Sequence, residues 1–172
     1  MTRTRLVISV AVVIIAAVAV SSAQEQAKRG PSTPEERAAV VAFAQRYVQD
    51  PLNKDLFEER ARLVKVMEGV PDIHVGICAE GMAWLAKKYK YSGELTSAYL
   101  LGNSAYVIRQ MESGRDRNDA AAHLAGLDAA IRTYQSIVSR EPKARWKEMD
   151  QLVGKQQSGE LQKMTFCGNS GA

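Results

Sequence analysis

Apolar residues recur every three or four positions along most of the chain between residues 33 and 163. This spacing lines one face of an α-helix, whereas a half-buried strand needs strict alternation of apolar and polar residues. No segment alternates in that way for long enough to indicate a strand. The pattern therefore predicts an all-α fold, a compact antiparallel bundle of about six helices.

Capping and helix-breaking residues mark the ends of the expected helices. Thr33 and Glu36 have the spacing of a capping box around Pro34, a residue favoured in the first helical turn. Asp72 is a candidate N-cap, and glycines and prolines separate the apolar runs. These signals predict helices over residues 34–49, 53–69, 72–89, 92–112, 119–141 and 146–153, and a short final turn near residue 160.

The helix expected over residues 92–112 is apolar on almost every side, which indicates the central element of the bundle. Asn103 and Ser104 interrupt its apolar surface, and they either hydrogen-bond to a neighbouring helix or line a small polar pocket. Aromatic residues are dense in the same part of the chain, where they form either core or one wall of a ligand groove. The candidate groove or pocket residues are Trp84, Tyr99, Asn103 and Tyr106.

Residues 1–23 have the three-part organisation of a secretory signal peptide. A short basic start precedes an apolar run over residues 6–20, and small residues end the segment at Ala23. The apolar run is shorter than the roughly 20 residues that span a bilayer. We therefore expect cleavage after Ala23 and export to the periplasm or the extracellular space. The alternative is an uncleaved signal that tethers the protein to a membrane.

The rest of the chain is long enough for one domain with a sizeable core. Residues 24–32 are polar and predict a flexible leader, residues 33–167 a single helical domain, and residues 168–172 a flexible tail. Loss of residues 1–23 removes two arginines and lowers the formal net charge from +4 to +2. The basic and aromatic run at 87–91 is expected to complement a helix C-terminus, and no nucleic-acid partner is expected.

The two cysteines, Cys78 and Cys167, are expected to pair, because the protein is expected to be exported. The bridge would hold a C-terminal tail that has few apolar residues of its own. The chain-entropy model assigns about 4–5 kcal/mol to the closure of so long a loop. Two unpaired thiols, or a reactive or metal-bound Cys78, are the alternatives.

His74 lies four residues before Cys78, so both would share one face of the expected helix. That face could bind a metal or use the thiol, with Glu80 or His123 as a further group. No Cys-x-x-Cys, His-Glu-x-x-His or haem-attachment signature accompanies it. His123 beside an apolar stripe is typical of a hydrogen-bonded boundary residue. We therefore assign no metal, no cofactor and no catalytic residue.

Two segments resemble the halves of a tetratricopeptide repeat, the helix pair of protein-interaction scaffolds. Residues 97–106 contain a Leu-Gly-Asn sequence similar to the core of the motif's first helix. Residues 128–142 resemble the second helix, with Ala130, Tyr134 and Pro142 at its small, aromatic and terminating positions. The resemblance implies an antiparallel hairpin of these two segments, as in a protein that binds other proteins.

These features predict an exported helical binding or scaffold protein without catalytic activity, whose partner is a protein or a peptide. The alternative is a metal-dependent or thiol-based protein that uses the face formed by His74 and Cys78. No integral membrane span is expected once the signal is cleaved.

Overall fold

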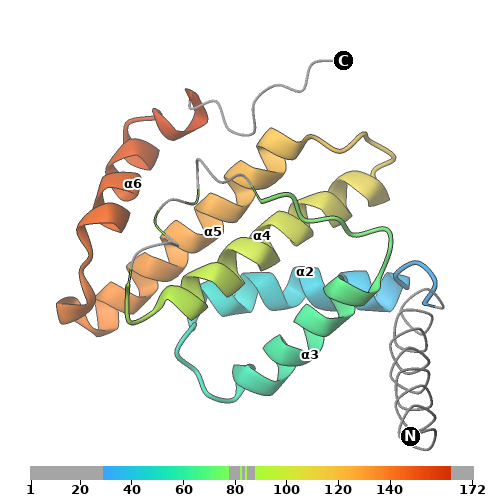
Figure 1. The fold of residues 1–172 in the computed structure, drawn as a ribbon, viewed down its shortest axis with the longest axis horizontal. Coiled ribbons are helices and arrows are strands. Elements are labelled where there is room, and N and C mark those ends of the chain that lie inside the picture. The colour runs from blue at the N-terminus through green and yellow to red at the C-terminus, as the bar shows by residue number, and fades with distance from the viewer. Residues whose placement is uncertain (1–28, 78–81, 83, 85–87, 164–172) are drawn as a thin grey trace, which may run out of the picture.

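The computed structural model describes residues 29–77, 82, 84 and 88–163. These residues form helices and connecting segments without any strand, which confirms the predicted all-α fold (Figure 1). The helices are α2 (Pro34–Gln49), α3 (Leu56–Gly69), α4 (Ser92–Glu112), α5 (Asp119–Arg140) and α6 (Lys147–Gln157), with 3-10 turns at Pro142–Ala144 and Leu161–Lys163.

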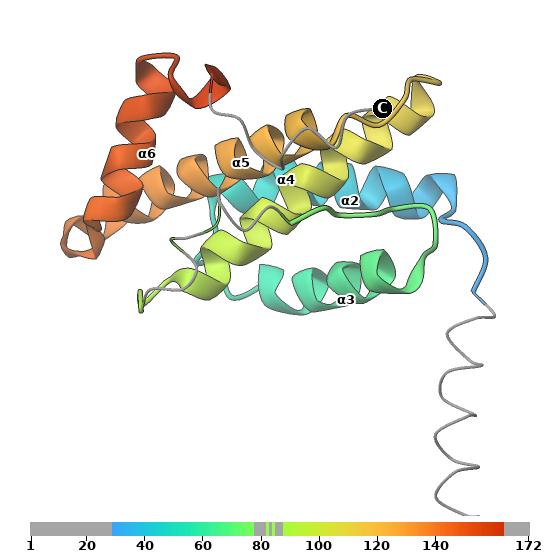
Figure 2. The same cartoon turned by 45° about the horizontal axis from the view of Figure 1, so that its top comes forward.

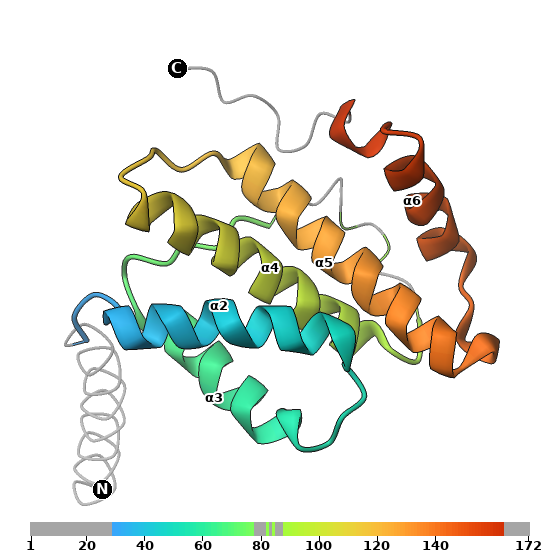
Figure 3. The same ribbon diagram turned by 180° about the vertical axis from the view of Figure 1, so that it is seen from behind.

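Helices α4 and α5 form the centre of the bundle. They run antiparallel and pack more extensively on each other than any other pair of described elements (Figure 1). Helix α2 lies against both of them, and α3 packs on α2 (Figure 3). Helix α6 packs on α5 near the C-terminal end of that helix (Figure 2).

Two clusters of buried side chains meet at α4. One cluster joins α4 to α5 and α6 and includes Leu95, Leu127 and Met149. The other joins α4 to α2 and α3 and includes Phe43 and Leu63. Because α4 contributes buried residues to both clusters, the prediction that this helix is the central element is confirmed.

Two glycines allow α4 and α5 to approach each other closely. A Cβ atom at Gly102 would lie 2.5 Å from the Cβ of Ala129 and 2.8 Å from the carbonyl oxygen of Ala125. A Cβ atom at Gly126 would lie 2.7 Å from the ring of Tyr99 and 2.9 Å from its carbonyl oxygen. These separations are far below the 3.5–4.0 Å of an ordinary carbon–carbon contact. A larger residue at either glycine would therefore push the two helices apart.

The start of α2 has the capping box that the sequence predicts. Thr33 Oγ1 accepts a hydrogen bond from the backbone N–H of Glu36 at 3.2 Å, and Glu36 Oε2 accepts one from the backbone N–H of Thr33 at 3.0 Å. The first bond satisfies one of the N–H groups that lack a partner within the helix, and the second satisfies the N–H of the cap residue itself. The capping residues therefore fix the point at which α2 begins.

The chain immediately before α2 is held against the end of α3. Arg29 pairs with Glu36 at 2.5 Å and donates a hydrogen bond to the carbonyl oxygen of Val66 at 3.4 Å. Ser32 donates from its backbone N–H and from its hydroxyl to the carboxylate of Asp72, at 2.8 and 2.7 Å. These contacts connect the entry to α2 with the exit from α3.

The helix predicted from Asp72 to about Tyr89 is wrong for its first turns, because residues 72–77 are not helical. Asp72 caps no helix, since its carboxylate binds Ser32 instead. The run Ile73–Ile77 contains three β-branched residues and a glycine, all of which disfavour a helix. The side chains of α4 supply hydrogen bonds to this backbone in place of the helical ones.

The residues at the expected end of that helix form a turn before α4. Tyr89 stacks on Trp146 with the ring centres 4.6 Å apart. Lys90 pairs with Glu141 at 3.2 Å, and the hydroxyl of Tyr91 donates a hydrogen bond to the same carboxylate. Lys90 and Tyr91 thus contact Glu141, the residue that caps the C-terminal end of α5, while the end of the helix expected before them lies outside the described residues.

Several predictions concern residues outside the described ranges and stay predictions. They are the signal peptide at 1–23, the disulfide between Cys78 and Cys167, and the tail at 168–172. Among the helices that the structure does describe, none is long and apolar enough to cross a membrane.

Candidate binding sites

The structure places three of the four predicted groove residues in the core. Trp84, Tyr99 and Asn103 are buried, and Tyr106 is half-buried on α4. Trp84 and Tyr99 pack in the same apolar cluster. In this arrangement their side chains fill space between elements of the bundle.

Tyr99 and Asn103 nevertheless belong to a buried polar centre. The hydroxyl of Tyr99 lies 2.6 Å from His123 Nδ1 and donates to the carbonyl oxygen of Gly76 at 3.1 Å. Asn103 Nδ2 donates to the same carbonyl at 3.2 Å. Of the two roles that the sequence left open for Asn103, the hydrogen bond to a neighbouring element is the one formed. The centre ties the segment 72–77 to α4 and α5.

Burial keeps this centre uncharged. It lowers the pKa of His123 and raises the pKa of Tyr99, because removal from water disfavours the charged form of each group. When the hydroxyl of Tyr99 donates to Gly76, the ring nitrogen of His123 is the donor to the hydroxyl oxygen. His123 and Tyr99 are both fully buried, so no substrate reaches them in this conformation. The geometry is that of a structural network.

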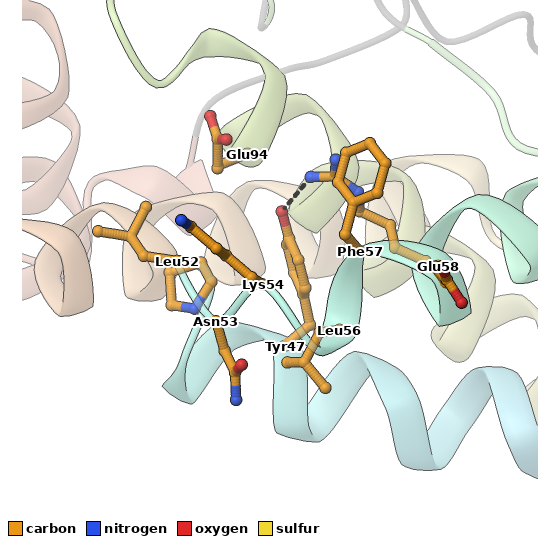
Figure 4. A pocket seen from close by; sticks show the side chains of 10 residues that line it. Tyr47, Leu52, Asn53, Lys54, Leu56, Phe57, Glu58 and Glu94 are labelled. Carbon is orange, nitrogen blue, oxygen red and sulfur yellow. Dashed lines mark hydrogen bonds between the residues drawn. The ribbon is translucent and has the colours of Figure 1, made fainter.

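A solvent-facing cavity of about 430 Å³ lies where α2 ends and where α3 and α4 begin (Figure 4). Its walls come from three elements and from the turn between α2 and α3. Polar and apolar side chains are mixed along it. The lining residues are Tyr47, Pro51, Leu52, Asn53, Lys54, Leu56, Phe57, Glu58, Arg60 and Glu94.

Arg60 is the most constrained charged group of this cavity. Its Nη1 donates a hydrogen bond to the hydroxyl of Tyr47 at 2.9 Å (Figure 4). Its guanidinium carbon lies 4.9 Å from the ring centre of Phe57 and 5.8 Å from that of Tyr47. Arginine is attracted electrostatically to aromatic faces at such distances. The two aromatic residues therefore hold the guanidinium in one place.

Phe57 is unusually exposed for an aromatic residue, with 61% of its surface accessible to solvent. Tyr47, by contrast, is 1% exposed, so only its hydroxyl end takes part in the cavity. Burial raises the pKa of the Tyr47 phenol, and the hydrogen bond from Arg60 opposes that shift. The ordinary pKa of a tyrosine phenol is already near 10, and the net shift is upward, so this phenol is neutral at physiological pH.

Two cationic and two anionic side chains line the cavity. Lys54 and Arg60 are positive, and Glu58 and Glu94 are negative. Lys54, Glu58 and Glu94 form no ion pair with any other residue that the structure describes. The lining is therefore close to neutral, with charges that remain available to a ligand.

A second cavity, of about 320 Å³, lies between the end of α3, the segment 72–77 and α4. Its lining is almost entirely apolar, and it includes Ile77, which is 63% exposed. Ile77 is also the last residue before a part of the chain that the structure does not describe. The lining residues are Val64, Met67, Glu68, Ile73, Val75, Ile77 and Leu100.

The predicted alternative site is not assembled in the described part of the chain. His74 is exposed on a non-helical segment, and Cys78 and Glu80 lie outside the described residues. Because residues 72–77 are not helical, His74 does not stand on the predicted helix, and the prediction that it shares a face with Cys78 involves a residue outside the described ranges. Within the described ranges, no three His, Cys, Asp or Glu side chains are placed to hold a metal ion.

The sequence did not reveal the first cavity. Tyr47 fits the apolar stripe of α2, and Phe57 and Arg60 stand one turn apart on α3, an ordinary spacing. Only the packing of α3 on α2 brings the guanidinium of Arg60 within hydrogen-bond distance of the Tyr47 hydroxyl. The one available signal was Phe57, an aromatic residue among charged neighbours at the start of a helix.

Comparisons of the chain with known protein families, with characterised proteins and with solved structures give no match. The segments that resemble a tetratricopeptide repeat, residues 97–106 and 128–142, lie mainly on the antiparallel helices α4 and α5. The hairpin that the resemblance implied is thus present, and the likeness is confined to these short segments.

Proposed function

We propose that the protein is a non-catalytic binding protein that acts outside the cytoplasm and holds a peptide segment of a partner in the cavity beside Arg60. The observation that carries this proposal is Phe57, a large aromatic side chain left in solvent at the edge of a cavity. Aromatic residues, phenylalanine included, and arginine are enriched at protein interfaces, and arginine is also frequent among binding hot spots. The volume of the cavity is also within the usual range for ligand sites.

The remaining parts of the proposal come from the sequence. Residues 1–23 support export, and export supports a disulfide between Cys78 and Cys167. Mass spectrometry of an unreduced digest tests the bridge, which requires one linked peptide pair. Two freely alkylated thiols would contradict it and would return attention to the face of His74 and Cys78.

A peptide library tests the binding function. Random peptides are displayed with both ends available and selected on the full chain and on the Phe57→Ser variant. The proposal expects families of peptides that the native chain enriches and the variant loses. Enrichment that is the same for both proteins would place binding elsewhere and would contradict the proposal. A Lys65→Ser variant, at an exposed position of the same helix α3 that lines neither cavity, is the control.

A further inference from the structure

We infer that the cavity beside Arg60 recognises a free carboxylate next to an apolar side chain, as at the C-terminus of a peptide that ends in an apolar residue. This inference rests on the proposed function and names the part of the partner that enters the site. Four properties of the described residues lead to it: the pairing of the arginines, the aromatic support of Arg60, the charge balance and the open edge of the cavity.

Arg60 differs from the other partly buried arginines of the described chain. Arg29 pairs with Glu36, and Arg37 pairs with Glu112. Arg60 is also half-buried, yet its only hydrogen bond goes to a neutral phenol and no described carboxylate pairs with it. A guanidinium removed in part from water gains from a carboxylate partner. The missing carboxylate is what we assign to the ligand.

The guanidinium is also prepared for such a partner. Tyr47 uses an N–H of Nη1, and the groups at Nε and Nη2 make no hydrogen bond to other described residues. A planar guanidinium donates two parallel hydrogen bonds to one carboxylate. Because Phe57 and Tyr47 already hold the group, little side-chain entropy is lost when the ligand binds. Lys54 adds a second positive charge in the same lining.

The charge balance offers a dianion no net attraction. Glu58 and Glu94 oppose the attraction that Lys54 and Arg60 exert on an anion, so the two unused N–H groups of Arg60, which suit one carboxylate, decide the ligand. Glu94 stands in the first turn of α4 and lines the cavity together with Lys54 (Figure 4). Its carboxylate can accept a hydrogen bond from the amide N–H of the terminal residue. The site thus offers a partner for each polar group of a chain end.

The apolar part of the lining accommodates the terminal side chain. Leu52 and Leu56 are partly buried there, and Phe57 offers an exposed ring. Lys54, Phe57 and Glu58 are all exposed, so the cavity is open along the start of α3. A peptide can therefore leave through this edge, whereas a free amino acid would fill only the inner part. Free amino acids share the chemistry, and the experiment separates the two sources.

Fluorescence anisotropy on the full chain tests the inference. The probe is fluorescein-labelled Gly-Ser-Gly-Ser-Phe with a free C-terminal carboxylate, compared with the same peptide as its C-terminal amide. We expect the acid to bind at least about tenfold more tightly, which is the usual value of a charge-assisted hydrogen bond. Arg60→Gln should remove this preference. Arg62→Gln removes the same charge from an exposed position on the same helix and should leave the preference intact.

Glu94→Gln separates a chain end from a free amino acid. Glutamine still accepts a hydrogen bond from an amide N–H, so binding of the acid peptide should be unchanged or stronger after the negative charge is removed. Free phenylalanine should compete only weakly with the acid peptide in the native chain, whereas a site built for free amino acids would bind it tightly and lose that affinity in the same variant, because the ammonium group needs the negative charge. Tight competition by phenylalanine that depends on Glu94 would assign the site to free amino acids and overturn the inference.

Two further results overturn the inference, and each leaves the proposed function distinguishable from it. Equal affinity for acid and amide, or equal loss in Arg60→Gln and Arg62→Gln, removes the carboxylate from the recognition. If library peptides are still enriched on the native chain and lost on Phe57→Ser, the proposed function would nevertheless be supported. If Arg60→Gln does not fold, as judged by its circular dichroism, Tyr47→Phe is used instead. It removes only the hydroxyl that positions the arginine and should weaken the preference by several fold.

Discussion

The helix pair α4–α5 and helix α3 differ in how deeply their side chains are buried. Between α4 and α5, glycines bring the backbones together, and Leu127, Ile131 and Leu95 are completely buried. Helix α3 buries only Leu63 and Met67, and it has a cavity at each end. The α4–α5 contact is closely packed at its glycines, and the cavity of about 190 Å³ that the two helices line with α2 is smaller than either cavity at the ends of α3.

The difference teaches that stability and recognition are carried by separate parts of this small bundle. A side chain with no solvent contact contributes mainly to the free energy of unfolding, and its loss leaves a void. An exposed aromatic residue contributes little to folding and remains available for a partner. Substitutions in the two regions should therefore differ in both size and kind of effect.

The largest difference is expected for the same substitution at two leucines. Leu127→Ala in α5 should lower the free energy of unfolding by about 3 kcal/mol, because the fully buried side chain leaves a cavity. Leu56→Ala in α3 should cost about 1 kcal/mol, because that residue is only partly buried. Urea denaturation followed by circular dichroism measures both. Equal losses would show that α3 is as tightly integrated as the central pair.

Alanine at two glycines should have effects of opposite sign. Gly126→Ala should destabilise by about 1–2 kcal/mol, since the new methyl group collides with Tyr99 and its cost exceeds the gain in helix propensity. Gly154→Ala in α6 has open space around the added methyl group and should stabilise by about 0.5–1 kcal/mol. Thermal melts of both variants give the signs. Stabilisation by Gly126→Ala would mean that α4 and α5 separate easily.

A pH dependence should distinguish the buried centre from the exposed segment. Burial lowers the pKa of His123 in the folded state, so below the ordinary value of 6.5 the unfolded chain binds a proton that the folded chain excludes. Stability is therefore complete above pH 6.5 and decreases as the pH falls from there toward the folded pKa of His123. Unfolding by urea at pH 7.5, 6.5 and 5.5 measures the decrease.

The chain's second histidine provides the control for that measurement. His74 is exposed, and His74→Gln should retain the pH dependence, whereas His123→Gln should lose it. NMR titration of the His123 ring is a measurement that needs no variant, since the pKa of His123 should lie below the ordinary value of 6.5. A higher pKa for His123 would contradict the neutral centre.

The smallest effect on stability is expected at the residue most important for the proposed function. Phe57→Ser should change the free energy of unfolding by no more than about 0.5 kcal/mol, because an exposed side chain buries little surface. The same variant should abolish selection of peptides in the library experiment. A large loss of stability would show that Phe57 is part of the core, and the binding result would then lose its meaning.

Periodicity and capping predicted the helices well, because each signal is local. Thr33 and Glu36 fix the start of α2, and the apolar character of α4 correctly indicated the central helix. The failure at residues 72–77 has a tertiary cause. Tyr99 and Asn103, which donate hydrogen bonds to Gly76, lie more than twenty positions away in the sequence. The residues around Asp72 give no signal that predicts these two hydrogen bonds.

The cavity beside Arg60 could not be predicted for the same reason. Tyr47 and Arg60 meet only because α3 folds back on α2, and the contribution of Glu94 comes from a third helix. For Tyr99 and Asn103 the sequence left two roles open, since polar and aromatic residues within an apolar helix fit either a pocket or a buried network. Burial separates the two, and burial is a property of the folded chain.

Arg29 and Ser32 fix the point at which the preceding chain joins the bundle. Their contacts with Glu36 and Asp72 hold that point at the start of α2, whereas Tyr47 and the cavity lie at the other end of the same helix. At 1.5 Å per residue, α2 separates the two by about 20 Å. If residues 1–23 remain as a membrane tether, that tether therefore joins the bundle at the end of α2 opposite the cavity, and a chain end can reach the cavity without passing the point of attachment.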